Sequence, residues 1–309
     1  MTLIAIFGPT AVGKTEIAIE VADLLRGRNE EPVAVSADAF QVYEGLQVLT
    51  AKPSEAQLAK LEHRLISFVP VNETFSVAQF AEHAHREIDR LVERGCRPIV
   101  VGGTGLYLRA ALTTLDLKPP PDPGLREQLE QDLVELGLEA LHNQLPTDTA
   151  HSVDPRDRKR IIRALELERM GEDLYTTSDQ LWSTELRRPA VLFGVVMDRE
   201  ALAERISERV DEMLGRGLVD EVELALERGA SRTSRKAIGF KEAQAVLNGE
   251  LSREQAADQI KRRHRHYVRR QLTWMRKIPG VDLVDRTTLS AAEAAASILH
   301  RLPANVESG

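Results

Sequence analysis

The stretch that decides the fold is Thr-Leu-Ile-Ala-Ile-Phe-Gly-Pro-Thr-Ala-Val-Gly-Lys-Thr, residues 2–15. Residues 2–7 form an apolar run typical of a buried strand. Residues 8–15 match the pattern G-x-x-x-x-G-K-[ST] of a phosphate-binding loop, and residues 16–26 carry apolar side chains at helical spacing. The pattern therefore lies between a predicted strand and a predicted helix, which is the context that a true phosphate-binding loop requires.

This loop would bind phosphate through its backbone and one cation. Gly8 and Gly13 allow a tight turn in which N–H groups converge on phosphate oxygens, and the following helix adds its positive end. Lys14 can bind the terminal phosphates, and Thr15 can offer its hydroxyl to Mg²⁺. The predicted phosphate-binding residues are Gly8, Pro9, Thr10, Ala11, Val12, Gly13, Lys14 and Thr15. A triphosphate, a nucleotide diphosphate and a pyrophosphate ester all remain possible ligands.

Composition places the chain among ordinary globular proteins. Of its 309 residues, 42% are hydrophobic and 29% are charged, and no apolar run has the length of a membrane span. Residues 1–7 lack the basic start of a signal peptide. The single cysteine, Cys96, excludes an internal disulfide and a cysteine-rich zinc site, which fits a reducing compartment. We therefore expect a cytoplasmic protein, a monomer, that does not enter a membrane.

Two further strand ends carry polar side chains. Asp38 follows the predicted strand 32–36, and the carboxyl end of a parallel strand faces the ligand crevice of an α/β sheet. Thr104 follows the predicted strand 98–101, where many ATPases carry an acidic residue for Mg²⁺. The missing acid weakens the interpretation as a motor or switch ATPase. A turn or cap role for Asp38, and a tight turn without a ligand at Thr104, are the alternatives.

The proline-rich stretch 118–124 predicts a domain boundary. About 65 residues beyond it have helical patterns and no strand, and the strand predicted at 191–197 returns the chain to the sheet. Another strand is predicted at 65–69. The fold class is thus α/β, a P-loop NTPase-like parallel sheet flanked by helices, with an all-helical insertion domain. The core would comprise residues 1–117 and 191–309, including C-terminal helices, and the insertion residues 118–190.

Two basic stretches stand out in a chain of net charge −7. Five Lys or Arg lie between residues 156 and 163, and residues 261–277 carry eight Lys or Arg, two His and no acid. Such a helix indicates an anion-binding face. It could instead be a solvated face paired with acidic neighbours. Tyr267 and Trp274, seven residues apart and therefore on one side, could stack on bases or belong to the core.

Together these segments resemble the tRNA dimethylallyltransferases, also called isopentenyltransferases, in the bacterial form that lacks the C-terminal zinc finger. The stretches that carry the resemblance are residues 8–15, Ser36-Ala37-Asp38, Gln41-Val42-Tyr43, Thr50-Ala51-Lys52-Pro53, Gly102-Gly103-Thr104-Gly105-Leu106-Tyr107, residues 160–166, Ala237-Ile238-Gly239-Phe240-Lys241 and Arg270-Gln271-Leu272-Thr273-Trp274. The chain departs from the family pattern at Ala39, Phe40, Leu49, Asp154 and Phe240. None of these departures removes a group with an assigned chemical role.

The resemblance implies transfer of a dimethylallyl group from dimethylallyl diphosphate to N6 of the adenosine 3′-adjacent to a tRNA anticodon. It implies Asp38 as the base, Thr104 as a contact to the adenosine, and Lys14, Thr15 and Mg²⁺ at the diphosphate. Base and leaving group fit the chemistry, because N6 must lose a proton while diphosphate departs. The residues expected to contact tRNA are Asp38, Ala39, Phe40, Gln41, Thr104, Lys159, Arg160, Arg163, Lys236, Lys241, Arg269, Arg270, Gln271, Trp274 and Arg276.

The alternative function is an ATP-dependent small-molecule or nucleotide kinase. It would share the phosphate-binding loop, Mg²⁺ and the carboxylate, so nucleotide binding at the loop fits both functions. It does not explain the two basic stretches. A non-catalytic, GTPase-like RNA-binding module ranks last, because the sequence lacks an Asn-Lys-x-Asp stretch to read guanine.

Overall fold

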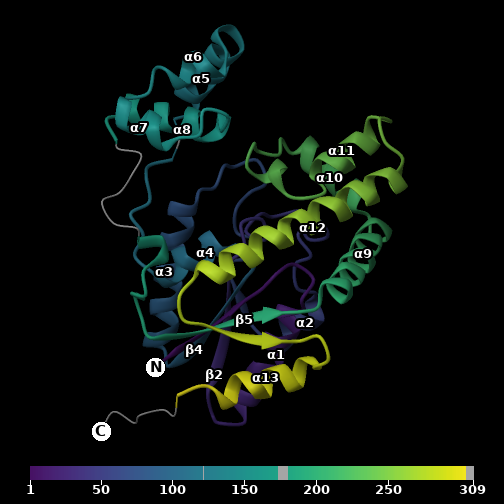
Figure 1. The fold of residues 1–309 in the computed structure, drawn as a ribbon. Coiled ribbons are helices and arrows are strands. Elements are labelled where there is room, and N and C mark those ends of the chain that lie inside the picture. Colours follow the sequence, from purple (N-terminus) through teal and green to yellow (C-terminus); the bar gives the residue numbers. More distant parts are fainter. Residues whose placement is uncertain (121, 173–179, 304–309) are drawn as a thin grey trace. The chain divides into compact units, whose positions relative to one another are not determined.

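The computed structural model describes residues 1–120, 122–172 and 180–303 (Figure 1). Its sheet has six strands, all parallel, in the order β3-β2-β4-β1-β5-β6. The strands are β1 (Leu3–Phe7), β2 (Glu31–Ser36), β3 (His63–Arg64), β4 (Cys96–Gly102), β5 (Ala190–Val196) and β6 (Val281–Asp285). Phe7 pairs with both Gly102 and Gly194, so β1 and β4 end level with each other, whereas β5 continues to Val196. The predicted parallel α/β sheet is confirmed.

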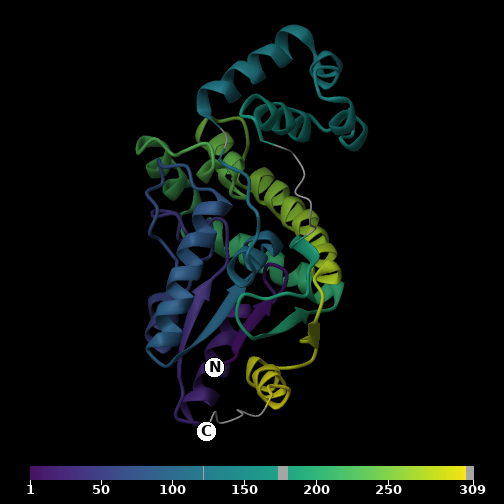
Figure 2. The same cartoon turned by 90° about the vertical axis from the view of Figure 1, so that its left-hand side faces the viewer.

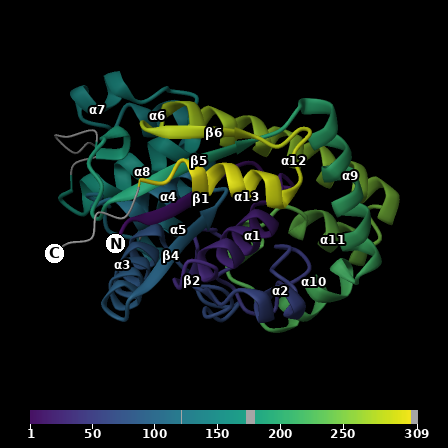
Figure 3. The ribbon, with the colours of Figure 1, turned by 90° about the horizontal axis from the view of Figure 1, so that it is seen from below.

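Helices cover both sides of this sheet. They are α1 (Lys14–Arg26), α2 (Glu55–Lys60), α3 (Val77–Glu93), α4 (Gly105–Leu112), α9 (Arg199–Gly215), α10 (Leu218–Glu227), α11 (Phe240–Leu247), α12 (Arg253–Lys277) and α13 (Ala291–His300), with short 3₁₀ turns at Gln180–Trp182 and Ser234–Lys236. Helix α12 runs above β5 and β6 in Figure 1, whereas α1 and α13 lie side by side below them (Figures 1 and 3). Figure 2 shows α12 running from the α10–α11 helices to the strand β6 that follows it.

The third predicted strand is wrong. Strand β3 consists of two residues, His63 and Arg64, and the predicted range 65–69 is irregular. Leu65 and Ser67 have φ values of 61° and 47°, in the left-handed region, and a strand cannot pass through such residues. Helix α3 begins directly after Ser76, because Ser76 and Gln79 form a capping box at its start.

The chain forms two compact units, residues 1–114 with 181–309, and residues 115–180. The limits predicted from the sequence are residues 118 and 190. Residues 181–189 instead pack with the larger unit, where the Arg187 amide donates to the Leu112 carbonyl at 2.8 Å. Pro121 and residues 173–179, which the predicted insertion includes, lie outside the described residues.

The smaller unit has its own core. Its helices are α5 (Pro123–Leu136), α6 (Leu138–His142), α7 (Thr147–Ser152) and α8 (Arg158–Arg169), and they bury a cluster that includes Leu129, Leu141, Ile161 and Leu165. Glu166 is fully buried there and accepts hydrogen bonds from Arg126 at 2.9 Å and Arg163 at 3.2 Å. The buried carboxylate is therefore neutralised by two arginines.

No helix in the described parts of the chain is both long enough and apolar enough to cross a membrane.

Candidate active site

The phosphate-binding loop joins β1 to α1 and takes a conformation that leaves N–H groups open. Ala11 and Gly13 have φ values of 65° and 90°, and α1 begins at Lys14 with no capping side chain among the described residues. The first N–H groups of a helix have no partner within the helix and attract anions. The loop is therefore preorganised to bind a phosphate group.

Lys14 lies within this loop. Its Nζ donates to the carbonyls of Gly8 at 3.0 Å and Pro9 at 2.9 Å. Burial, together with the positive charge of Arg209, lowers the pKa of Lys14 to about 8, although the Asp38 carboxylate opposes both effects. A diphosphate would restore the missing negative charge beside this ammonium group.

Arg286, which the sequence analysis did not single out, supports the loop from the end of β6. Its guanidinium donates to the Val12 carbonyl at 2.7 Å and to the Glu16 carboxylate at 2.6 Å, and the residue is 6% exposed. A Cβ atom on Gly13 would lie 1.4 Å from Arg286 Nη1. Glycine is thus required at this position both for its positive φ and for the arginine that packs on it.

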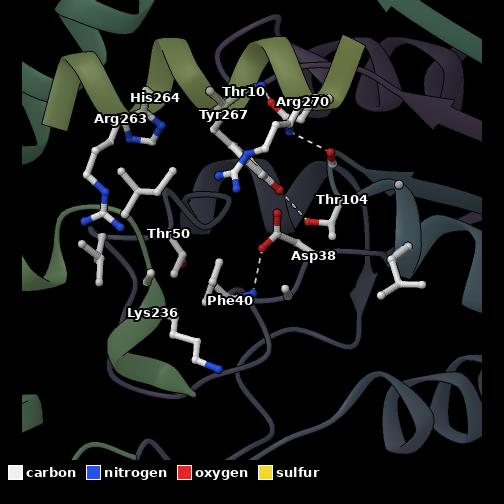
Figure 4. A pocket seen from close by; sticks show the side chains of 18 of the residues that line it. Thr10, Asp38, Phe40, Thr50, Thr104, Lys236, Arg263, His264, Tyr267 and Arg270 are labelled. Atoms are coloured by element: carbon white, nitrogen blue, oxygen red, sulfur yellow. Dashed lines mark hydrogen bonds between the residues drawn. The ribbon is translucent and has the colours of Figure 1, made fainter. Parts of the chain in front are cut away.

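Asp38 lies just beyond the end of β2. Its Oδ1 accepts hydrogen bonds from the backbone amides of Phe40 at 2.9 Å and Gln41 at 3.2 Å. This is the turn role that the sequence allowed, but Figure 4 shows the carboxylate pointing into a cavity toward Thr104. Oδ2 has no hydrogen-bond partner among the described residues, so this oxygen is free to accept a proton or a hydrogen bond.

Thr104 and Tyr267 face Asp38 across the same cavity (Figure 4). Thr104 precedes α4, Tyr267 belongs to α12, and their hydroxyl oxygens are 2.9 Å apart. Burial and the charge of Asp38 raise the pKa of Tyr267 to about 12. Its phenol therefore stays protonated and can donate a hydrogen bond. The Arg270 guanidinium lies 5.5 Å from the centre of the Tyr267 ring, a cation–π contact.

Gln271 and Trp274 connect α12 to the phosphate-binding loop and to the glycine-containing loop between β4 and α4. Gln271 donates to the Gly103 carbonyl at 2.7 Å and accepts from the Thr10 amide at 3.0 Å. The Trp274 ring packs so closely on Gly105 that a Cβ atom there would lie 2.5 Å from the indole. Helix α12 thus forms a wall of the site as well as a basic surface.

Two cavities meet at Asp38. One, of about 560 Å³, lies over the phosphate-binding loop. The other, of about 390 Å³, has apolar walls that include Leu49, Leu106, Ile238 and Trp274. The residues that line both are Thr10, Asp38, Thr50, Gly103, Arg209, Tyr267 and Gln271. A ligand in the first cavity and a ligand in the second would meet beside the Asp38 carboxylate.

The comparisons with known proteins decide the family. A model of the IPP transferase family matches residues 41–278. The chain belongs to this family. It is 38% identical to a tRNA dimethylallyltransferase of Acetivibrio thermocellus over 298 residues, 94% of each chain, and 36% identical to one of Staphylococcus carnosus over 93% of this chain and 92% of the other. Among solved structures, a tRNA isopentenylpyrophosphate transferase of Bacillus halodurans covers 97% of this chain and 94% of its own, at 35% identity and a TM-score of 0.70.

A more distant structural match also covers the chain. A eukaryotic dimethylallyltransferase described as acting on tRNA covers 97% of this chain and 77% of its own, at 26% identity and a TM-score of 0.73.

Most of the site residues predicted from the sequence line the two cavities. Thr10, Ala11, Gly13, Lys14, Thr15, Asp38 and Gln41 line the first, and Asp38, Ala39, Phe40, Thr104, Lys236, Arg270, Gln271 and Trp274 line the second. Lys241, Arg269 and Arg276 are exposed outside both, and Gly8, Pro9 and Val12 complete the loop without lining either. Leu49, a departure from the family pattern, lines the second cavity, whereas Phe240 is fully buried.

The predicted residues of the insertion differ in exposure. Lys159 and Arg160 are exposed on α8. Arg163 is engaged within its own unit, by Glu166 and by the Pro119 carbonyl, so its side chain is not an open cation. Of these three predicted tRNA contacts, Lys159 and Arg160 therefore remain as candidates.

Besides Arg286, the polar residues Arg209 and His264 of the site were not predicted from the sequence. Arg209, from α9, lines both cavities; burial lowers its pKa, and its Nε has no hydrogen-bond partner among the described residues. His264, from α12, lines the second cavity and is 7% exposed. On the sequence each resembles a charged or polar position on an exposed helix face, so no local signal distinguishes them.

The basic helix is only partly neutralised by acidic neighbours. Lys261 pairs with Asp211 at 2.7 Å, and Arg263 pairs with Glu242 at 2.7 Å. Within residues 261–277 of α12, the arginines that are exposed and have no carboxylate within ion-pair distance among the described residues are Arg262, Arg265, Arg269, Arg270 and Arg276. This unpaired set favours an anion-binding face over a merely solvated one.

Proposed function

We propose that the chain transfers a dimethylallyl group from dimethylallyl diphosphate to N6 of the adenosine 3′-adjacent to the anticodon of a tRNA, and releases diphosphate. One observation carries the proposal: Asp38 stands where the cavity over the phosphate-binding loop meets the more apolar cavity. The leaving group and the amine must meet at such a point. The names of the relatives, tRNA dimethylallyltransferases, agree with this activity.

The chemistry requires two kinds of help. The allylic carbon–oxygen bond breaks as the N6–carbon bond forms, and N6 then loses a proton. Loop N–H groups, Lys14 and Arg209 would stabilise the charge that builds up on the diphosphate. Asp38 Oδ2 would accept the proton from N6, because its Oδ1 is already occupied by two backbone amides.

Mg²⁺ is the cofactor that we assign to the diphosphate cavity. The described residues contain no group of three or more His, Cys, Asp or Glu side chains that could hold a metal ion. Mg²⁺ at phosphate sites typically takes only one or two protein ligands besides phosphate oxygens, so this lining fits it. The Thr15 hydroxyl, which lines the cavity, would hold the ion, and the ion would neutralise charge on the diphosphate.

The second cavity would hold the target base. Phe40, Tyr267 and Trp274 provide aromatic surface, and the Thr104–Tyr267 hydroxyl pair provides hydrogen bonds. A base must leave its stack to enter such a site, and this costs least for a base in an unpaired loop.

An activity assay tests the proposed function. Incubation with labelled dimethylallyl diphosphate should transfer the label to tRNA, which is recovered by acid precipitation. Phosphoryl transfer from ATP to a small molecule or nucleotide, with unlabelled tRNA, would support the kinase alternative instead.

The tRNA backbone would lie on the unpaired arginines of α12, with Lys236, Lys241, Lys159 and Arg160 as further contacts. We expect the double variant Arg269→Gln/Arg276→Gln to bind tRNA more weakly and with a smaller salt dependence. Each phosphate contact that is lost should reduce the slope of log K against log salt by about one. Fluorescence anisotropy with labelled tRNA at several salt concentrations measures this slope.

A matched control is Arg28→Gln, an exposed arginine between α1 and β2, at the end of the sheet opposite the cavities. It should leave the slope unchanged. A double variant with the wild-type slope would show that α12 is not the tRNA-binding face.

Above pH 8, the Lys14 side chain should take up a proton when diphosphate binds. The pKa of Lys14 is about 8 in the free protein, so the side chain is increasingly neutral as pH rises through that value. A bound diphosphate favours the ammonium form and raises this pKa, so affinity should fall as pH increases above 8. Calorimetry of pyrophosphate binding at about pH 9, in buffers of different ionisation enthalpy, counts the protons.

The comparison variant is Lys14→Arg, whose guanidinium stays charged at this pH. It should take up less proton than wild type, and the difference removes the contribution of pyrophosphate itself. Equal proton uptake in both proteins would contradict the role given to Lys14.

That the protein is a cytoplasmic monomer stays a prediction. Light scattering would test the monomer, and cell fractionation would test the cytoplasmic location.

A further inference from the structure

His264 lines the second cavity with a buried side chain that makes no hydrogen bond. Among the described residues of this cavity, it is the one whose buried side chain has no hydrogen-bond partner for any of its polar atoms. Its Nδ1 and Nε2 are both buried and have no hydrogen-bond partner in the described parts of the chain. The residue is 7% exposed and lies one helical turn before Tyr267 on α12. Figure 4 shows its ring pointing from α12 into the cavity, on the side away from Thr104. Buried polar groups are nearly always paired, so this ring awaits a partner.

No described side chain is hydrogen-bonded to this ring, not even that of Arg209, whose own Nε is unpartnered in the same cavity. The Arg263 guanidinium is bound by Glu242 at 2.7 Å and 2.8 Å. The Tyr267 hydroxyl is paired with Thr104, and the Gln271 amide is bound at both ends. The missing hydrogen bond must therefore come from something that enters the cavity.

The chemistry of the substrates narrows the choice. A dimethylallyl group has no hydrogen-bonding atom. The diphosphate belongs to the cavity over the phosphate-binding loop, and His264 does not line that cavity. Among the substrate groups, a nucleobase in the second cavity remains, and its edges carry both donors and acceptors.

We propose that His264 binds the target adenine by donating a hydrogen bond to one of its ring nitrogens, N1 or N7, and that at N1 this bond would make His264 specificity-determining. The inference rests on the proposed function and deepens it. N1 and N7 are the acceptors that flank the amino group on its two sides, and the amino group itself faces Asp38. Guanine offers N1–H at the first position, so a donor at that position would discriminate against it.

The protonation state of His264 agrees with this geometry. Burial, together with the positive charges of Arg209 and Arg263, lowers the pKa of His264 to about 3. The ring is therefore neutral at working pH, with one N–H donor and one acceptor.

A double-mutant cycle between protein and RNA tests the proposal. The substrates are anticodon stem-loops with adenosine, 1-deazaadenosine, 7-deazaadenosine or 3-deazaadenosine at the target position. The enzymes are wild type and His264→Leu, which removes the hydrogen bond at similar volume, with His264→Phe as a second variant that keeps a ring. The measurement is kcat/KM for transfer, with thermal melting to confirm that each variant is folded.

In wild type, either 1-deaza or 7-deaza substitution should lower kcat/KM by about 3- to 10-fold beyond its effect on the variants. The cycle cancels the altered reactivity of N6, because that change is common to all the enzymes. His264 would bind something else if no deaza substitution distinguished wild type from the variants, or if only 3-deaza did so. If wild type fails to modify even the adenosine stem-loop, the proposed function fails, and the inference fails with it.

Discussion

Asp38→Asn should lower the single-turnover rate of dimethylallyl transfer by about 10²–10⁴-fold, the usual contribution of a general base. The asparagine carbonyl can still accept the Phe40 and Gln41 amides, so the turn that Asp38 forms should persist. The amide cannot accept a proton from N6, however. The loss should therefore appear in the chemical step, whereas binding of tRNA and of pyrophosphate stays close to wild type.

The measurement is single-turnover transfer with saturating tRNA and donor, beside separate binding titrations. Thr50→Val is the comparison variant. Thr50 lines the same two cavities, but its side chain does not act as a base in the proposed chemistry. A near-normal rate in Asp38→Asn would mean that the proton leaves by another route and that Asp38 only positions the base.

Lys14→Ala should lower the transfer rate by about 10²–10³-fold, as the loss of a preorganised donor to a developing anion typically does. Unlike Asp38→Asn, it should also weaken pyrophosphate binding, because the ammonium group lies within the phosphate-binding loop. Isothermal calorimetry with pyrophosphate and Mg²⁺ measures this second effect, and the contrast between the two variants separates proton removal from leaving-group stabilisation.

Lys60→Ala serves as the control, since Lys60 is an exposed lysine at the end of α2. It should change neither quantity. Retained pyrophosphate affinity in a folded Lys14→Ala protein would place the diphosphate somewhere other than this loop.

The parts of the site that could be predicted are those that local sequence determines. The phosphate-binding loop follows from the spacing of Gly8, Gly13 and Lys14 between a strand and a helix. The proximity of Asp38 and Thr104 could also be predicted. Each follows a strand of the parallel sheet, and the carboxyl ends of such strands lie at one edge of the sheet. No knowledge of side-chain packing was needed for these residues.

The parts that could not be predicted depend on contacts between distant segments. Strand β6 received no prediction, so Arg286 could not be placed against Val12, 274 residues earlier. Likewise, Glu166 is buried against Arg126, 40 residues earlier in the chain, and this burial depends on how α8 packs in its unit. The unpartnered nitrogens of His264 are a property of the folded cavity, and no spacing in the sequence reports them.

The measurement that tests the account most directly is mass spectrometry of tRNA fragments after incubation with the protein, dimethylallyl diphosphate and Mg²⁺. We expect that one adenosine, 3′-adjacent to the anticodon, gains the mass of a dimethylallyl group in place of a hydrogen, with the group on N6. We also expect that diphosphate is released in equal amount, and that Asp38→Asn protein forms this product far more slowly. An unmodified adenosine at that position, in a tRNA that the protein binds, would contradict the account.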